Sequence, residues 1–225
     1  MKTLKKMSLF LIVGGGMASA LFGSKVQAAE EEESANKTAE TTTSFSLEAG
    51  DDETIPGIID PEVKPPTNQK GKLTINAVSN IVFPNTKLGN ESGAPIKAQV
   101  PVGEKLGVQI TDIRGTGAGW KLAVAATEFQ NAEKTLTLRG AKVTIPGTGN
   151  TVTEEGNDLT FEPTSQKVVL GPDKNILLSA TKDKGLGKWL HYFENDSDKV
   201  TIEIPSGNKV ATYISDLTWT LEDAP

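Results

Sequence analysis

Apolar and polar residues alternate in short runs along residues 71–225. A period of two places every second side chain on one face, which is typical of a half-buried β-strand. Between the runs lie clusters of glycine, proline, asparagine and aspartate, which favour turns. Runs of this kind occur at residues 73–77, 108–110, 120–124, 136–138, 143–145, 176–178, 200–204 and 217–221. They predict an all-β antiparallel domain over residues 66–225, either a β-sandwich or a barrel-like fold.

A helical period of 3.6 residues is not evident over any long segment. The best short candidate for a helix is Ala125–Lys134, about two turns, crossing the end of the sheets. Many short strands and at most one short helix still predict an all-β class.

The first 28 residues have the layout of a secretory signal peptide. Lys2, Lys5 and Lys6 precede an apolar stretch that is too short to cross about 30 Å of hydrocarbon. Small residues follow, and we predict cleavage between Ala28 and Ala29. No second long apolar run follows, so we expect a secreted protein without a transmembrane helix in its mature form.

Residues 29–65 are acidic, contain several prolines and have few apolar residues, which predicts a disordered leader. It acts either as a spacer or only as a solubilising tail. Residues 29–60 hold ten acidic residues and one lysine, a net charge of -9, whereas residues 61–225 hold 19 acidic and 18 basic residues, a net of -1. The overall charge of -6 therefore describes a nearly neutral domain behind an acidic leader.

Composition excludes several kinds of chemistry. There is no cysteine and only one histidine, His191, and no nucleophile motif accompanies that residue. The glycines of residues 114–119 lack the spacing of a nucleotide loop, and the oxygen-rich residues 194–198 lack the glycine and distal glutamate of a calcium loop. We therefore predict no catalytic, metal-binding or cofactor-binding residue, and the acidic balance argues against a nucleic-acid partner.

Two of the three tryptophans share one tripeptide pattern. Trp120 and Leu122 flank Lys121, and Trp219 and Leu221 flank Thr220. A spacing of two places each pair on one face of a strand. Three arrangements are open: both faces lie in the core, the indoles are exposed and stack on a sugar ring, or one tryptophan is buried while the other lies at a rim.

The surroundings of these motifs resemble the WxL domain of Gram-positive surface proteins. The first motif follows the glycine-rich turn of residues 115–119. The second matches a distal Tyr-x-x-x-Leu-Thr-Trp-x-Leu pattern through Tyr213, Leu217, Trp219 and Leu221. The resemblance covers roughly residues 60–225.

The resemblance implies a protein at the cell surface that binds the cell wall non-covalently, with peptidoglycan as ligand. It also implies partners among other surface proteins, including a WxL-interacting protein, and makes the six motif residues a wall-binding surface or its scaffold. The sequence ends without a sortase signal, which fits non-covalent attachment. The alternative is a subunit that recognises a partner surface protein rather than glycan; a glycan-active enzyme is disfavoured.

Overall fold

The chain is described by a computed structural model at residues 41–90 and 94–224, so the predicted signal peptide and its cleavage site lie outside the described residues. The described part is all-β and antiparallel, as the sequence predicted, and its twelve strands form three sheets. The strands are β1 Leu73–Val78, β2 Ile96–Lys97, β3 Gly107–Asp112, β4 Trp120–Ala126, β5 Lys142–Ile145, β6 Thr151–Thr153, β7 Thr164–Ser165, β8 Val168–Val169, β9 Asn175–Ala180, β10 Gly187–Tyr192, β11 Thr201–Glu203 and β12 Leu217–Asp223. A single 3-10 turn, η1 (Leu159–Phe161), is the helical element within those residues.

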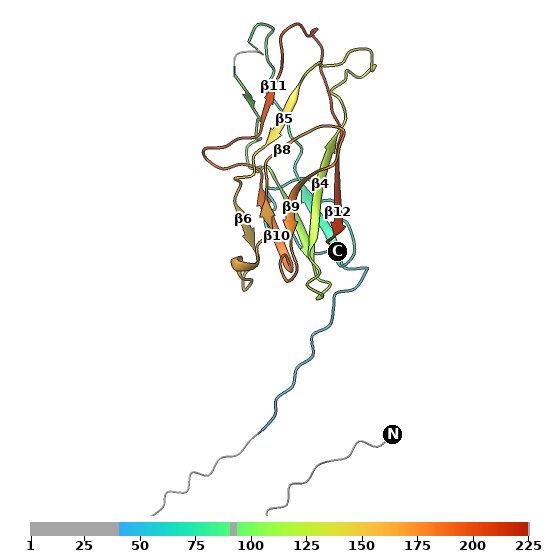
Figure 1. Cartoon of the computed structure of the whole chain (residues 1–225), viewed down its shortest axis with the longest axis vertical. Helices are drawn as coiled ribbons and strands as arrows, with labels where there is room; N and C mark the ends of the chain where they lie inside the picture. The colour runs from blue at the N-terminus through green and yellow to red at the C-terminus, as the bar shows by residue number, and fades with distance from the viewer. Residues whose placement is uncertain (1–40, 91–93, 225) are drawn as a thin grey trace, which may run out of the picture. The chain divides into compact units, whose positions relative to one another are not determined.

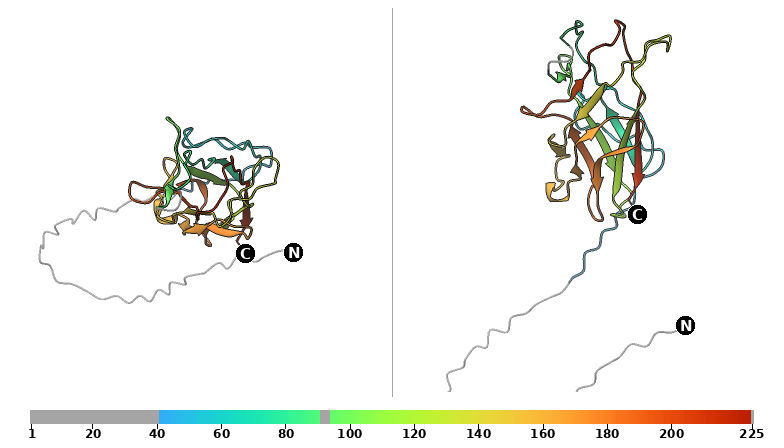
Figure 2. Two further views of the ribbon diagram at one scale, coloured as in Figure 1. Left: turned by 90° about the horizontal axis from the view of Figure 1, so that it is seen from above. Right: turned by 45° about the horizontal axis from the view of Figure 1, so that its top comes forward.

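Each sheet has four strands. The first has the order β1-β3-β10-β6, the second β12-β4-β9-β7 and the third β2-β11-β5-β8. The strands β5, β8 and β11 lie in the upper half of the domain, and β4, β9, β10 and β12 lie in the lower half (Figure 1). Seen from above, the ribbons surround a common interior (Figure 2). The order of the second sheet places β12 at its edge, paired with β4 alone.

One hydrophobic core lies under all three sheets. Ile110 of β3, Leu122 of β4 and Ile145 of β5 are each fully buried in it. Alternation explains this arrangement, because inward side chains of each strand are apolar while their neighbours face outward. The three tryptophans all contact this core, Trp120 and Trp189 as buried members and Trp219 as a half-buried neighbour.

A strap formed by residues 57–67 covers the outer face of the first sheet. Val63 is 1% exposed and packs with Ala77 and Leu190 in a second, smaller apolar cluster. The strap is also held by polar contacts: the Gln109 side chain accepts from the Ile59 amide and donates to the Gly57 carbonyl. Most of this strap lies before residue 66, in the segment expected to be a disordered leader. The structure packs that part against the domain instead.

Two local predictions were wrong. Ala125 and Ala126 belong to β4, and residues 127–134 form a loop rather than a helix. Pairing decides the outcome, because β4 pairs with β12 as far as Ala126 and the loop then bridges Gln130 to Ile214. The run at residues 136–138 is likewise not a strand; it makes one isolated bridge, from Thr137 to Gln130.

Residues 46–225 form one compact unit, and residues 41–45 fall outside it. No helix in the described ranges is long and apolar enough to cross a membrane.

Candidate functional site

The two Trp-x-Leu motifs lie side by side on neighbouring antiparallel strands. The register of β4 and β12 pairs Leu122 with Leu221 and Val124 with Trp219. Trp120 is paired with Asp223 rather than with the second tryptophan. Paired residues share one face of a sheet, so both motifs present their tryptophan and leucine toward the same core. The structure thus brings together two motifs that lie about a hundred positions apart.

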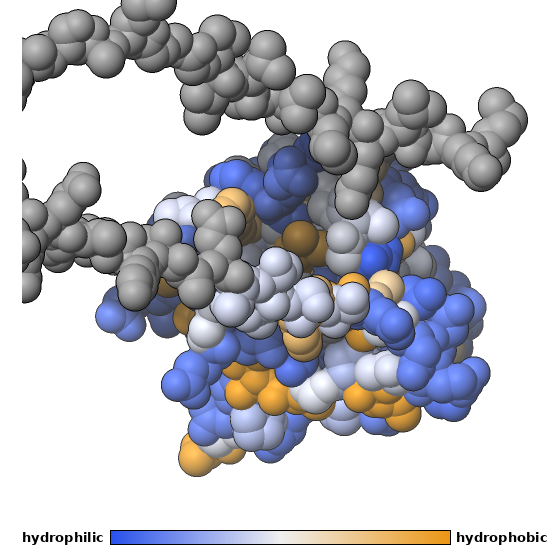
Figure 3. Space-filling model, turned by 90° about the horizontal axis from the view of Figure 1, so that it is seen from below, coloured by the Kyte–Doolittle hydropathy of each residue, from blue (hydrophilic) through white to orange (hydrophobic). Residues whose placement is uncertain are grey.

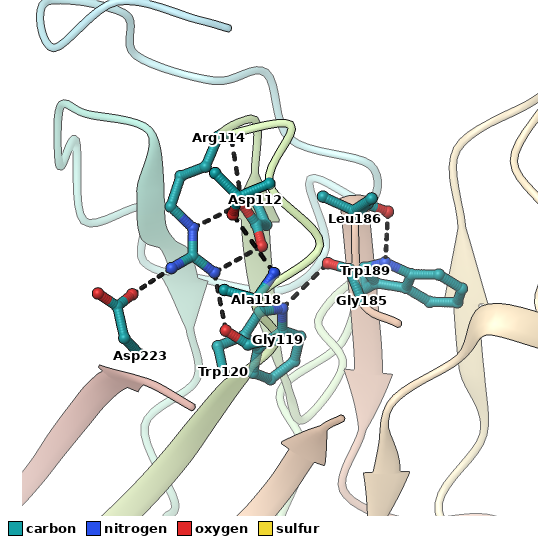
Figure 4. A network of polar contacts seen from close by, with 10 residues as sticks. Asp112, Arg114, Ala118, Gly119, Trp120, Gly185, Leu186, Trp189 and Asp223 are labelled. Carbon is teal, nitrogen blue, oxygen red and sulfur yellow. Dashed lines mark hydrogen bonds and ion pairs between the residues drawn. The ribbon is translucent and has the colours of Figure 1, made fainter. Parts of the chain in front are cut away.

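Trp120 is a core residue. Its side chain is 0% exposed, and its indole Nε1 donates a hydrogen bond to the Gly185 carbonyl at 3.0 Å (Figure 4). A Cβ at Gly185 would lie 2.6 Å from that nitrogen, and Gly185 has a φ of +72°, so glycine is required there on two counts. A buried indole with its only donor satisfied presents no face to a sugar ring.

Trp219 occupies a different position. It is half-buried at the sheet edge and stacks on buried Phe193, with ring centroids 5.5 Å apart and an interplanar angle of 8°. Leu217 and Leu221, on the same face of β12, are also half-buried. Of the three arrangements left open by the sequence, the structure shows the mixed one, with one tryptophan buried and the other at the rim.

Tyr213 belongs to the distal pattern but not to the sheet. It lies in the loop before β12, half-exposed, and its hydroxyl donates to the Lys209 carbonyl at 2.8 Å. The structure therefore assembles five of the six motif residues on two paired strands and leaves Tyr213 in the preceding loop.

An arginine joins the ends of the two motifs. Arg114 donates to Asp112 from Nε at 2.9 Å and from its terminal nitrogen at 2.7 Å, to the Gly119 carbonyl at 2.8 Å, and to Asp223 (Figure 4). Its bond to the fully buried Asp112 carboxylate is the main cause that raises the pKa of Arg114. Sequence reasoning assigned no role to Arg114; its place just before the glycine-rich turn was the available signal.

The third tryptophan and the single histidine lie on β10. Trp189 is 2% exposed and donates from Nε1 to the Leu186 carbonyl at 2.8 Å. His191 is 1% exposed, and its Nδ1 lies 3.0 Å from the Thr151 hydroxyl, while Nε2 has no partner among the described residues. Burial lowers the pKa of His191 to about 4. The side chain is therefore a neutral interior group.

Tyr192 lines an open cleft of about 830 Å³. Its hydroxyl donates to Asp60 of the strap at 2.6 Å, and Lys105 binds both Asp60 and Glu62. Partial burial, followed by the bond to Asp60, raises the pKa of Tyr192 to about 12. Burial alone would raise the pKa of Asp60, but its bonds from Tyr192 and Lys105 outweigh this and lower it.

The other wall of the cleft is the oxygen-rich turn at residues 194–198. The Asn195 side chain accepts from the amides of Ser197 and Asp198, each at 2.8 Å, so the segment is a hydrogen-bonded turn. Within residues 41–90 and 94–224, no three acidic or histidine side chains group as metal ligands do. Asn150 and Asp196 also line the cleft, and both are exposed.

The surface at the lower end of the domain is mainly hydrophilic. Figure 3 shows apolar side chains there in separate small groups among polar ones, rather than as one continuous patch. This face therefore shows no broad apolar patch of the kind that marks an interaction site.

Comparison with known proteins places the fold and its paired motifs in context. No curated protein and no solved structure matches the chain. A family model described as the WxL domain, surface cell wall-binding, matches residues 34–225, which includes the strap as well as both motifs. The chain therefore belongs to the WxL domain family of surface cell-wall-binding proteins.

Proposed function

We propose that this protein is exported and held non-covalently on the wall of a Gram-positive cell, with peptidoglycan as its ligand, as part of a surface complex. The observation that carries the proposal is the family match over residues 34–225. The predicted signal peptide supports export, and the paired motifs support an intact domain of this type.

The two motifs act as a scaffold in this proposal. Trp120 and Leu122 are fully buried, and Trp219 turns its ring toward Phe193. Their contribution is to fix β12 on β4 in one register, because a one-residue slip would move every apolar side chain of β12 to solvent.

The glycan contact is proposed at the cleft beside Tyr192. The half-exposed Tyr192 ring has the Lys105 ammonium 5.4 Å from its centroid and lies in a cleft lined by exposed amide and carboxylate groups. This combination suits an amino sugar, whose ring has an apolar face and polar substituents. Lys199 and Glu194 also line the cleft and are paired with each other at 3.4 Å. Groups of both signs suit a ligand that carries carboxylates and ammonium groups, as peptide-substituted glycans do.

The experiment is a sedimentation assay of residues 29–225 with purified, protein-free peptidoglycan. Wild type is expected in the pellet, and Asn150→Ala with Asp196→Ala is expected to shift to the supernatant while circular dichroism stays unchanged. The matched control is Asn85→Ala with Asp173→Ala, two exposed polar residues outside the cleft. Wild type remaining in the supernatant while folded contradicts direct wall binding. Equal binding by wild type and the cleft variant contradicts the proposal that glycan binds in the cleft.

The second candidate is a subunit that recognises a partner surface protein and reaches the wall through it. The free edge of β12 favours this candidate, because an unpaired strand edge accepts a strand from another chain. Binding to native walls that disappears on protein-free peptidoglycan, or on walls from cells lacking the partner, would distinguish it from direct recognition of glycan.

A further inference from the structure

The edge strand β12 has one side without a backbone partner. Among the described residues, β12 pairs only with β4, and no isolated bridge involves residues 217–223. About every second residue of β12 therefore points its amide and carbonyl groups to a side that has no strand partner. Natural proteins cover or shorten such edges, because an open edge pairs with other chains. Figure 2 shows β12 at an outer corner of the domain when seen from above.

The edge also has two distinct faces. Leu217, Trp219 and Leu221 point toward the core and are only half-buried, whereas Thr218 and Glu222 on the other face are exposed. A strand added beside β12 would complete the burial of the three apolar side chains if it carried apolar residues on the same face. The open edge of β12 therefore fits an added strand of about seven residues that is apolar on one face and polar on the other.

Residues 43–49 match this requirement. Phe45, Leu47 and Ala49 alternate with three polar residues, Ser44, Ser46 and Glu48. Phe45 and Leu47 are each 88% exposed, so neither is buried in its own chain. Two large apolar side chains on one face of an exposed segment call for a partner, since the described domain does not bury them.

The exposure of this segment beside its attachment point favours a second copy over its own chain as the acceptor. The Gly50 amide donates to the Ile113 carbonyl at 3.0 Å, so the backbone is fixed immediately after the segment. A Cβ at Gly50 would lie 2.2 Å from the Ile113 side chain, so the backbone is held tightly against that residue. The backbone is thus fixed at Gly50 while Phe45 and Leu47 before it stay exposed, so the chain does not place these side chains on its own β12.

We propose that residues 43–49 of one copy add as a strand to the free edge of β12 in a second copy. The apolar face of the added strand continues the row formed by Leu217, Trp219 and Leu221, and its polar face continues that of Thr218 and Glu222. The distal WxL strand then serves self-assembly through its backbone edge, while its side chains complete a shared core.

The test measures the molar mass of residues 29–225 by light scattering after size exclusion, from low to high micromolar concentration. Wild type is expected to reach about twice the monomer mass or more as concentration rises. Phe45→Ser with Leu47→Ser is expected to remain monomeric. The control Val102→Ser with Val210→Ser removes two apolar side chains that are 105% and 81% exposed, and it is expected to assemble as wild type does.

The acceptor is tested separately. A peptide of residues 42–50 is added to the Phe45→Ser/Leu47→Ser chain, and amide signals are followed by NMR. Signals of residues 217–223 are expected to shift, and a scrambled peptide is expected to leave them unchanged. A wild type that stays monomeric throughout, a control variant that also dissociates, or peptide shifts outside β12 would each overturn the proposal. None of these readouts involves peptidoglycan, so failure here leaves wall binding to be judged by sedimentation.

Discussion

The same tripeptide occupies two different environments in this domain. Trp120-Lys121-Leu122 lies in a strand flanked on both sides, by β12 and β9, and its tryptophan and leucine are fully buried. Trp219-Thr220-Leu221 lies at the edge, and its tryptophan and leucine are half-buried. The difference follows from the position of the strand and not from the motif. A repeated pattern in a sequence therefore does not imply a repeated role.

The largest expected difference between the two motifs is in stability. Trp120→Ala should lower the free energy of unfolding by about 3–5 kcal/mol, because it removes a fully buried ring and leaves the Gly185 carbonyl without its donor. Urea unfolding followed by circular dichroism measures it. Trp120→Phe keeps a ring and should cost clearly less; an equal loss in both variants would mean that the hydrogen bond, rather than the volume, dominates.

A buried histidine on the interior strand β10 should also make the free energy of unfolding depend on pH. The pKa of His191 on β10 is lowered from 6.5 to about 4, so the unfolded chain binds a proton in that window and the folded chain does not. Stability is therefore full above about pH 6.5 and falls by about 3 kcal/mol as the pH drops to 4.

Urea unfolding at several pH values measures this slope. His191→Asn, which keeps a polar group near Thr151, should lose the His191 part of the slope whatever its stability at pH 7. Carboxylates such as Asp60 contribute in both proteins and cancel in the comparison. Parallel curves for the two proteins would show that His191 is not the titrating group.

At the edge, the same deletion should matter less. Trp219→Ala removes a half-buried ring and its stacking on Phe193, so we expect a loss of about 2 kcal/mol, roughly half of the Trp120→Ala effect. The two variants unfolded side by side test the comparison directly. Equal losses would mean that the edge is as well packed as the interior.

The smallest loss of stability is expected at the ion pair between Arg114 and Asp223, which joins the ends of the two motifs. Asp223→Asn weakens the ion pair with Arg114, but the Asp223 side chain is 73% exposed and Arg114 keeps its bonds to Asp112. The loss should stay below about 1 kcal/mol and shrink further in high salt. A large, salt-independent loss would show that Asp223 fixes the register of β12 and is not a surface partner.

Much of the fold could be predicted because alternation marks strands with one buried face. The runs beginning at Leu73, Val108 and Leu217 are confirmed as β1, β3 and β12. β10 was missed because it does not alternate: Trp189, Leu190 and His191 are all buried in succession. Leu190 is buried in the cluster where the strap residue Val63 packs on the outer face of its sheet. The strap cannot be recognised from the sequence of β10, because the local alternation of apolar and polar residues does not show that a distant segment covers the strand.

The candidate site was predictable in part. The spacing within each motif placed Trp and Leu on one face, and the register of β4 and β12 agrees. The burial of each tryptophan was not predictable, because it depends on which strand is central, and strand order is set by contacts far apart in sequence. The bonds from Arg114 to Asp223 and from Tyr192 to Asp60 belong to the same class of long-range contact.

The strap has a consequence for the order of folding. Asp60 meets Tyr192 across 132 positions, and Trp120 meets Asp223 across about a hundred. Contacts of such separation slow folding, because a long loop must close before they form. Docking of the strap must therefore wait for β10, and docking of β4 must wait for β12. The topology thus delays folding until nearly all of the domain is present.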